Sequence, residues 1–249
     1  MKFLRIEASG EYKIVKLNRP NVKNAFHPEM IAELTQAFAE FKSDVEIKAV
    51  VILGEGDVFC AGADLNWMQE MIKYSLAENQ KDSEKLWQMF EAIRLCERPV
   101  IGIVHGAVFG GALGLMACCD YVFAEEKTQF CFSEVKLGLV PAVISSFILK
   151  KVADGFVRPL MLSAEVFSTE KSKAIGLVHS IFNGPVIIDN CLKSFANNGL
   201  EAMSETKKLL NQLPSLDWAQ QMKRTTQVIS ERRVSTEGQS RLKKFIDKR

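Results

Sequence analysis

A glycine-rich stretch at residues 104–114 contains the residue types that present backbone N–H groups to a ligand. It follows an apolar run at 99–104, typical of a buried strand, and precedes an apolar helical run at 112–117. Gly110 and Gly111 therefore fall where the helix begins, where N–H groups lack helical partners and the helix dipole is positive. The stretch has neither the ending of a P-loop nor the spacing of a dinucleotide fingerprint. The glycine-rich stretch therefore favours stabilisation of a developing negative charge over the binding of a phosphate group.

A second small-residue turn, at residues 59–64, follows another apolar strand, which we expect at 49–53. A single glycine turn is equally compatible with a structural role, because glycine lets a strand turn tightly into a helix. Two such turns can supply two convergent N–H donors, which is the arrangement that an oxyanion requires.

One carboxylate interrupts an otherwise apolar run at residues 130–141. Carboxylates are rarely buried without a partner, so Glu134 either pairs with a Lys or Arg or performs acid–base chemistry. Composition alone leaves both interpretations open, with the ion pair somewhat favoured. Burial among the neighbouring apolar side chains would raise the pKa of this carboxyl group.

The elements that position these residues alternate between strand and helix up to about residue 185. The strands are expected at residues 12–17, 49–53, 99–104, 120–124 and 177–182. This alternation predicts an α/β fold with a largely parallel sheet over residues 1–185, and residues 186–249 read as helices only. A helix expected at 65–81 would point Trp67 and Met68 toward a pocket and pack Met71 and Ile72 on the core.

Composition excludes several other classes of function. The 249 residues are 47% hydrophobic, enough for one main domain, and 32 basic and 30 acidic residues give a formal net charge of +2. Without a basic stripe we expect no nucleic-acid partner, and without a long apolar run or a leader-like opening we expect a soluble cytoplasmic protein and no membrane partner. The six cysteines have no metal-ligand spacing, so we expect reduced thiols, no metal site and no redox cofactor.

Several segments resemble the enoyl-CoA hydratase/isomerase (crotonase) superfamily in order and spacing. They are residues 59–65, 106–111, 119–120, 130–138 and 174–178, and the resemblance covers nearly the whole chain. Residues 63–68, 117–120 and 133–145 are most similar to bacterial methylglutaconyl-CoA hydratases. The resemblance implies a crotonase-like spiral ββα core with a C-terminal helical trimerisation region, a homotrimer or hexamer, and an acyl-CoA substrate whose coenzyme A is no separate cofactor.

The resemblance also implies roles for individual residues. The superfamily holds the thioester oxygen between two backbone N–H groups, which correspond here to Ala63 and Gly111. Its hydratases commonly use two glutamates; the second aligns with Glu134 and the first with Gly114, which has no side chain. The implied substrate-binding residues are Val22, Lys23, Ala25, Ala61, Trp67, Met68, Pro141, Ala142 and Phe245.

Three functions therefore remain open from the sequence. The first is hydration of a 2-enoyl-CoA, with 3-methylglutaconyl-CoA as one candidate substrate. The second is double-bond isomerisation with Glu134 alone, which the glycine at position 114 favours. The third is an acyl-CoA-binding protein without activity, which a carboxylate kept in an apolar run argues against.

Overall fold

A computed structural model describes residues 1–44, 46–186 and 188–248. The chain divides into two compact units, described separately below. The first comprises Met1–Cys96 and Val100–Val186, and the second comprises Glu97–Pro99 with the helices from residue 188 onward.

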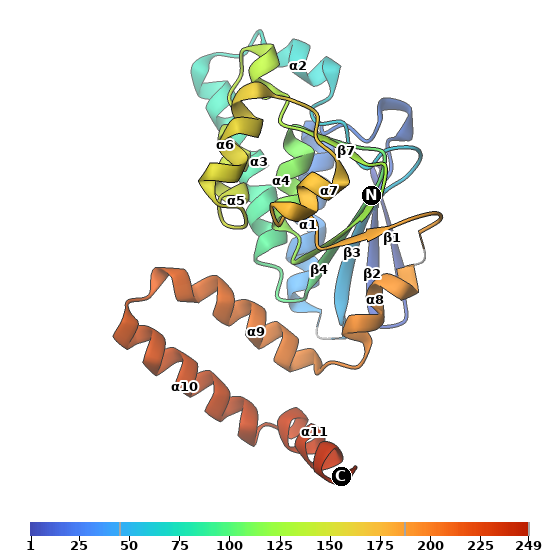
Figure 1. Cartoon of the computed structure of the whole chain (residues 1–249). Coiled ribbons are helices and arrows are strands. Elements are labelled where there is room, and N and C mark those ends of the chain that lie inside the picture. Colours follow the sequence, from blue (N-terminus) through green and yellow to red (C-terminus); the bar gives the residue numbers. More distant parts are fainter. Residues whose placement is uncertain (45, 187, 249) are drawn as a thin grey trace. The chain divides into compact units, whose positions relative to one another are not determined.

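The first unit is built on a six-stranded sheet (Figure 1). Its order is β1 (Leu4–Ser9), β2 (Tyr12–Leu17), β3 (Ala49–Gly54), β4 (Val100–Val104), β6 (Tyr121–Glu125) and β8 (Ser180–Phe182). Only β1 and β2 pair antiparallel, so the prediction of a largely parallel sheet is confirmed. A separate two-stranded parallel sheet joins β5 (Ala107–Phe109) to β7 (Gln129–Cys131).

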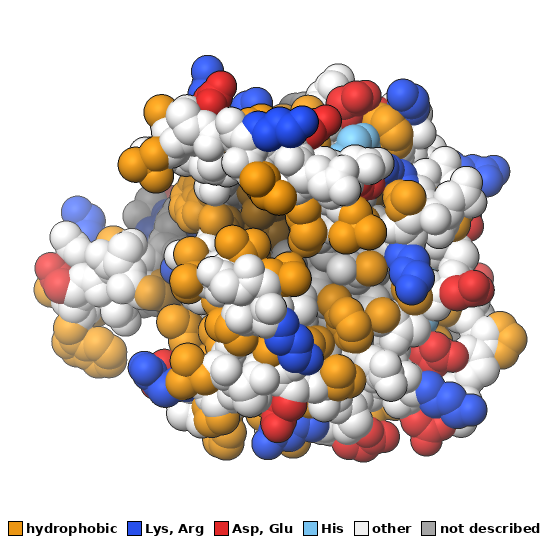
Figure 2. Space-filling view, turned by 90° about the horizontal axis from the view of Figure 1, so that it is seen from above, with side chains coloured by type: hydrophobic (Ala, Val, Ile, Leu, Met, Phe, Trp, Pro, Cys, Tyr) orange, Lys and Arg blue, Asp and Glu red, His pale blue; other side chains and the backbone are white. Residues whose placement is uncertain are grey.

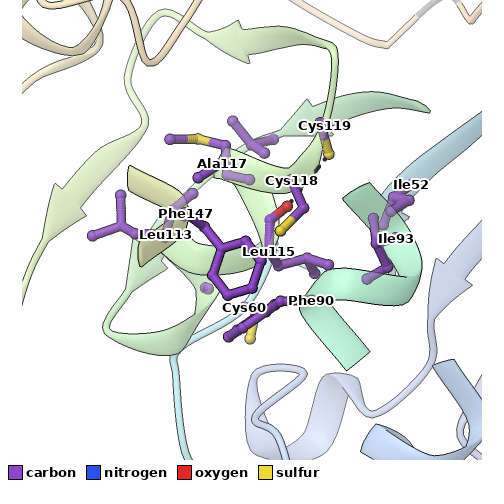
Figure 3. Close-up of a cluster of buried hydrophobic side chains, with 14 of the residues drawn as sticks. Ile52, Cys60, Phe90, Ile93, Leu113, Leu115, Ala117, Cys118, Cys119 and Phe147 are labelled. Atoms are coloured by element: carbon purple, nitrogen blue, oxygen red, sulfur yellow. Dashed lines mark hydrogen bonds between the residues drawn. The ribbon is translucent and has the colours of Figure 1, made fainter. Parts of the chain in front are cut away.

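Helices pack against this sheet and against one another. They are α1 (Pro28–Ser43), α2 (Leu65–Met71), α3 (Leu76–Arg94), α4 (Gly111–Cys118), α5 (Ala142–Ile148), α6 (Asp154–Ser163) and α7 (Thr169–Ala174), with short 3-10 helices η1 (Pro20–Val22) and η2 (Glu134–Leu137). Helix α4 contacts both α3 and α5, and every residue after its first is buried. Figure 3 shows its side chains among those of Phe90 and Phe147, whose rings lie 5.4 Å apart. The start of α4 is therefore fixed by the core.

The second unit consists of helices. They are α8 (Ile188–Ala196), α9 (Leu200–Gln212), the 3-10 helix η3 (Leu213–Ser215), α10 (Trp218–Val234) and α11 (Thr236–Ile246). The Arg232 guanidinium of α10 lies 2.5 Å from the Glu201 carboxylate of α9 and 3.6 Å from the Glu237 carboxylate of α11, which ties three helices together. Among the described residues, every helix is too short or too polar to span a lipid bilayer.

Some expected elements differ from the observed ones. The helix expected at 65–81 breaks after Met71, because Ser75 begins α3 with a capping box to Glu78 and Asn79 donates to backbone carbonyls of the break. Ile72, expected in the core, lies in this break and is 85% exposed, so that prediction was wrong. The strands β1, β5 and β7 were not predicted, and the strand expected from residue 177 begins only at Ser180.

A buried ion pair braces the second glycine turn. Asp64 caps α2 by accepting from the N–H groups of Asn66 and Trp67, and its carboxylate lies 2.7 Å from the Arg19 guanidinium. The exposed fractions of the two charged side chains are 15% for Arg19 and 6% for Asp64. Arg19 also donates to the carbonyl of Ala25, so one guanidinium fixes two segments at the turn.

Removing the Asp64 carboxylate should therefore be costly. We expect Asp64→Ala to lower the free energy of unfolding by about 2–4 kcal/mol, because α2 loses its cap and a largely buried guanidinium loses its partner. Asp154→Ala is the matched control, since the Asp154–Arg158 pair on α6 is exposed. It should cost less than about 1 kcal/mol in the same urea titration. Equal losses in the two variants would contradict the bracing role.

Candidate active site

The two glycine turns lie side by side in the first unit. Cys60 and Val108 form a parallel bridge, with the Cys60 N–H 3.2 Å from the Ala107 carbonyl oxygen. Gly62 has φ +96°, and a Cβ there would lie 2.9 Å from the carbonyl oxygen of Phe109. A glycine is required at position 62 because both the backbone conformation and the close approach exclude a side chain.

Two backbone N–H groups at these turns have no acceptor. The N–H groups of Ala63 and Gly111 donate no hydrogen bond within the described part of the chain, whereas those of Asp64 and Gly110 donate to Phe26 and Cys131. Gly111 is the first residue of α4, where a helical acceptor is lacking and the helix dipole is positive. Ala63 and Gly111 line the same cavity of about 320 Å³. Both residues with an unused donor therefore line one cavity.

Glu134 lines this cavity as well, at the first position of η2. Its Oε2 atom is buried and has no hydrogen-bond partner, and none of the ion pairs between described residues includes it. The interpretation of Glu134 as half of an ion pair is therefore wrong. Burial raises the pKa of its carboxyl group, and a hydrogen bond from its own backbone N–H opposes that rise in part.

Position 114 has no room for a second carboxylate. A Cβ on Gly114 would lie 2.5 Å from Cγ2 of Ile144 and 2.9 Å from Cζ of Phe90. Both neighbours are buried, and Phe90 belongs to the packed cluster drawn in Figure 3. The space that a glutamate would need at this position of α4 is filled with hydrocarbon.

The structure brings most of the expected site residues together. Lining the cavity with Ala63, Gly111 and Glu134 are five residues expected to bind substrate: Ala61, Trp67, Met68, Pro141 and Ala142. Figure 2, seen from the α2 end of the first unit, shows hydrophobic side chains gathered on this face. The walls are therefore largely apolar, as in most small-molecule sites.

The residues expected near the nucleotide lie outside the lining of this cavity. Val22 and Lys23 are exposed, and Ala25 is buried beside the second glycine turn. The carbonyl of Lys23 accepts from the Ala61 N–H at 3.0 Å, so this segment runs along the turn that carries Ala63. Phe245 belongs to α11 in the second unit and is 60% exposed.

Sequence reasoning missed several residues of the cavity. They include Phe26, Met71, Asn79, Asp82, Ser83, Leu86 and Ser133. Those on α3 follow the break between α2 and α3, which was not predicted from the sequence. Ser133 was within reach of sequence reasoning, because it directly precedes Glu134.

A cysteine nucleophile is excluded at the second turn. Burial raises the pKa of the Cys60 thiol to about 12, so it stays protonated at neutral pH. Within the described residues, no cluster of His, Cys, Asp and Glu could hold a metal ion. The groups beside the glycine turns that can do chemistry are two backbone N–H donors and the carboxylate of Glu134; a second carboxylate, Asp82, lines the same cavity from α3.

Comparison with known proteins decides the family. The model of the enoyl-CoA hydratase/isomerase family matches residues 8–249. The chain belongs to this family. A short-chain-enoyl-CoA hydratase of Clostridium acetobutylicum is 30% identical over 212 residues, covering 83% of this chain and 80% of the relative. The mitochondrial enoyl-CoA hydratase of Pongo abelii is 27% identical over 240 residues, covering 95% of this chain and 81% of the relative.

Solved structures of this family confirm the fold. A crystal structure of an enoyl-CoA hydratase from Shewanella pealeana superposes with a TM-score of 0.91 at 34% identity, covering 99% of this chain and 94% of the other. An enoyl-CoA hydratase/isomerase from Marinobacter aquaeolei gives a TM-score of 0.92 at 27% identity, covering 100% and 98%. The crotonase fold, with its mixed sheet and C-terminal helices, is thus established for this chain.

Gly110 offers a direct test of the site geometry. It has φ +52°, and a Cβ there would lie 3.3 Å from Oγ of Ser133 and 3.5 Å from Oε1 of Glu134. We expect Gly110→Ala to lower kcat on an enoyl-CoA about 100-fold, since small misplacements of reacting groups cost that much. Gly10→Ala is the control, because Gly10 also has a positive φ but no neighbour within 4 Å. Unchanged kcat in Gly110→Ala would contradict the geometry.

Proposed function

We propose that this protein is an enoyl-CoA hydratase that adds water across the 2,3 double bond of an acyl-CoA thioester. One observation carries the proposal: within the described part of the chain, a carboxylate whose buried Oε2 atom has no partner lines the same cavity as two residues whose backbone N–H groups have no acceptor. The relatives from Clostridium acetobutylicum and Pongo abelii, both named as enoyl-CoA hydratases, support it.

The N–H groups of Ala63 and Gly111 would stabilise the intermediate. When water adds to carbon 3 of an enoyl thioester, negative charge develops on the thioester oxygen as an enolate. Two donors already aimed at that oxygen lower the barrier by about 3 kcal/mol each in a site that excludes water. Because neither donor has an internal acceptor, no protein hydrogen bond must break when the substrate binds.

Glu134 would move the proton. Its carboxylate takes a proton from water while the water oxygen bonds to carbon 3, and the acid then returns that proton to carbon 2 of the enolate. The sum of these steps is the addition of one water, with Glu134 regenerated. Its raised pKa suits the first half of the cycle, because a carboxylate that binds its proton more tightly is a better base toward water.

The closed space at Gly114 keeps isomerisation as a second candidate. An isomerase needs to remove a proton from one carbon and return it to another, which a single carboxylate can do without water. A glutamate does not fit at position 114 in this packing, so in this proposal Glu134 carries the proton alone. A binding protein without activity is less favoured. Burying Oε2 of Glu134 without a hydrogen-bond partner lowers the free energy of unfolding, and a protein that only binds would gain nothing from this carboxylate.

The same proposal includes assembly as a homotrimer or hexamer. Contacts to the nucleotide part of the substrate from Lys23 and Phe245 also belong to it. For the acyl group, the sequence resemblance makes 3-methylglutaconyl-CoA one candidate.

Replacing the carboxylate tests the proposed chemistry. We expect Glu134→Gln to lower kcat for hydration of crotonyl-CoA by about 10²–10⁴-fold, because the amide can neither accept nor return the proton. The measurement is the loss of enoyl-thioester absorbance, with acyl-CoA affinity measured in parallel and expected to survive. Glu165→Gln, at an exposed position, is the control. Full activity of Glu134→Gln would rule out Glu134 as the group that moves the proton in either enzymatic function.

The pH profile gives an independent test. Glu134 must be ionised to act as a base, so kcat/KM falls as the pH drops through its pKa. Because burial raises that pKa, the acidic limb should have its midpoint above the ordinary value of 4.5. A midpoint at or below 4.5, measured with a substrate that is not charged in the acyl group, would contradict this assignment.

A 3-enoyl-CoA substrate separates the two enzymatic candidates. We expect rapid hydration of a 2-enoyl-CoA and slow conversion of the 3-enoyl isomer, each followed by product analysis of purified protein. Rapid conversion of the 3-enoyl thioester with no hydration of the 2-enoyl one would assign isomerisation instead. In that event the filled space at Gly114 explains the loss of hydration.

A further inference from the structure

Helices α2 and α3 form one wall of the cavity, and a carboxylate stands in it. Trp67, Met71 and Leu86 contribute hydrocarbon, and Asp82 contributes its side chain from α3. The Trp67 indole Nε1 donates to Oδ2 of Asp82 at 3.0 Å, and Trp67 is only 6% exposed. Asp82 is therefore anchored in the wall by a buried ring.

The cavity contains negative charge and no compensating cation. Among the described residues that line it, the charged ones are Asp82 and Glu134, and no Lys, Arg or His is present. Asn79 already directs its amide N–H groups to backbone carbonyls, including that of Tyr74 at 3.2 Å. The indole N–H of Trp67 is likewise engaged by Asp82.

A carboxylate at the end of an acyl chain would find no suitable partner here. Carboxylates in proteins are bound by cations or by several N–H donors, and a buried one without them is strongly disfavoured. It would also be repelled by Asp82, and repulsion between like charges grows where water is excluded. An uncharged acyl chain meets neither penalty and gains contact with the wall that Trp67, Met71 and Leu86 provide.

We propose that this cavity selects thioesters with an uncharged acyl group and that Asp82 is the residue that rejects an acyl carboxylate. The proposal rests on the assignment of the site as an enoyl-CoA hydratase site and specifies its substrate class. It disfavours 3-methylglutaconyl-CoA, whose acyl group ends in a carboxylate. Asp82 acts by charge, and its contact with Trp67 holds that charge in the wall.

Two thioesters whose acyl groups have similar size but different charge test this selectivity. Glutaconyl-CoA and 5-methyl-2-hexenoyl-CoA differ in that a carboxylate in the first is replaced by an isopropyl group in the second. We expect kcat/KM for the uncharged thioester to exceed that for glutaconyl-CoA by about 100-fold or more. The reason is that the Asp82 carboxylate repels the carboxylate of glutaconyl-CoA and no cation among the described residues of the cavity lining compensates it. A ratio near one, or a preference for glutaconyl-CoA, overturns the proposal.

Variants at position 82 assign the effect to this carboxylate. Asp82→Asn keeps an acceptor for the Trp67 indole and removes the charge, so it should lower the ratio about tenfold by raising activity on glutaconyl-CoA. Glu84→Gln removes a charge from an exposed position on the same helix and should leave the ratio unchanged. An unchanged ratio in Asp82→Asn overturns the role of Asp82.

Binding measurements keep this test separate from the test of catalysis. The dissociation constants of glutaryl-CoA and 5-methylhexanoyl-CoA, which are saturated and cannot be hydrated, report the same discrimination without turnover. Absence of hydration with both enoyl thioesters would refute the proposed function. Equal dissociation constants would refute the selectivity, whatever the turnover.

Discussion

The close contact of two glycine turns is the constraint on which the rest of the site depends. Gly62 approaches the backbone of Phe109 so closely that no side chain fits between them, and the bridge from Cys60 to Val108 fixes their register. Ala63 and Gly111, which follow the two residues in this contact, line one cavity. The parallel sheet, the buried helix α4 and the brace at Asp64 all hold these two turns in place.

The site contains polar groups for which the fold provides no hydrogen-bond partner. Within residues 1–44, 46–186 and 188–248, two N–H groups lack acceptors and a buried oxygen of Glu134 lacks a donor, although folded proteins satisfy nearly all such groups. Leaving them unpaired costs stability, and the dense packing around α4 offsets that cost. The exclusion of a side chain at Gly114 belongs to the same packing, because Phe90 and Ile144 use the space. The packing of the core and the absence of a second glutamate at position 114 are therefore linked.

The sequence predicted the sheet better than the cavity walls. The strand at Tyr12–Leu17 has the observed bounds, because alternation and turn residues are local signals. The short strands β5 and β7 escaped detection because three residues carry no periodicity. Asp82 could not be placed, since its position depends on the break between α2 and α3 and on a contact with Trp67 from another helix.

The central claim is that Ala63 and Gly111 together polarise a thioester carbonyl, and vibrational spectroscopy tests it most directly. Butyryl-CoA labelled with ¹³C at the thioester carbonyl cannot be hydrated, so its stretching frequency can be recorded while bound. Two strong hydrogen bonds weaken the C=O bond, and the account predicts a lower frequency in the complex than in water. A frequency equal to that in water, with saturating binding shown in the same sample, would contradict it.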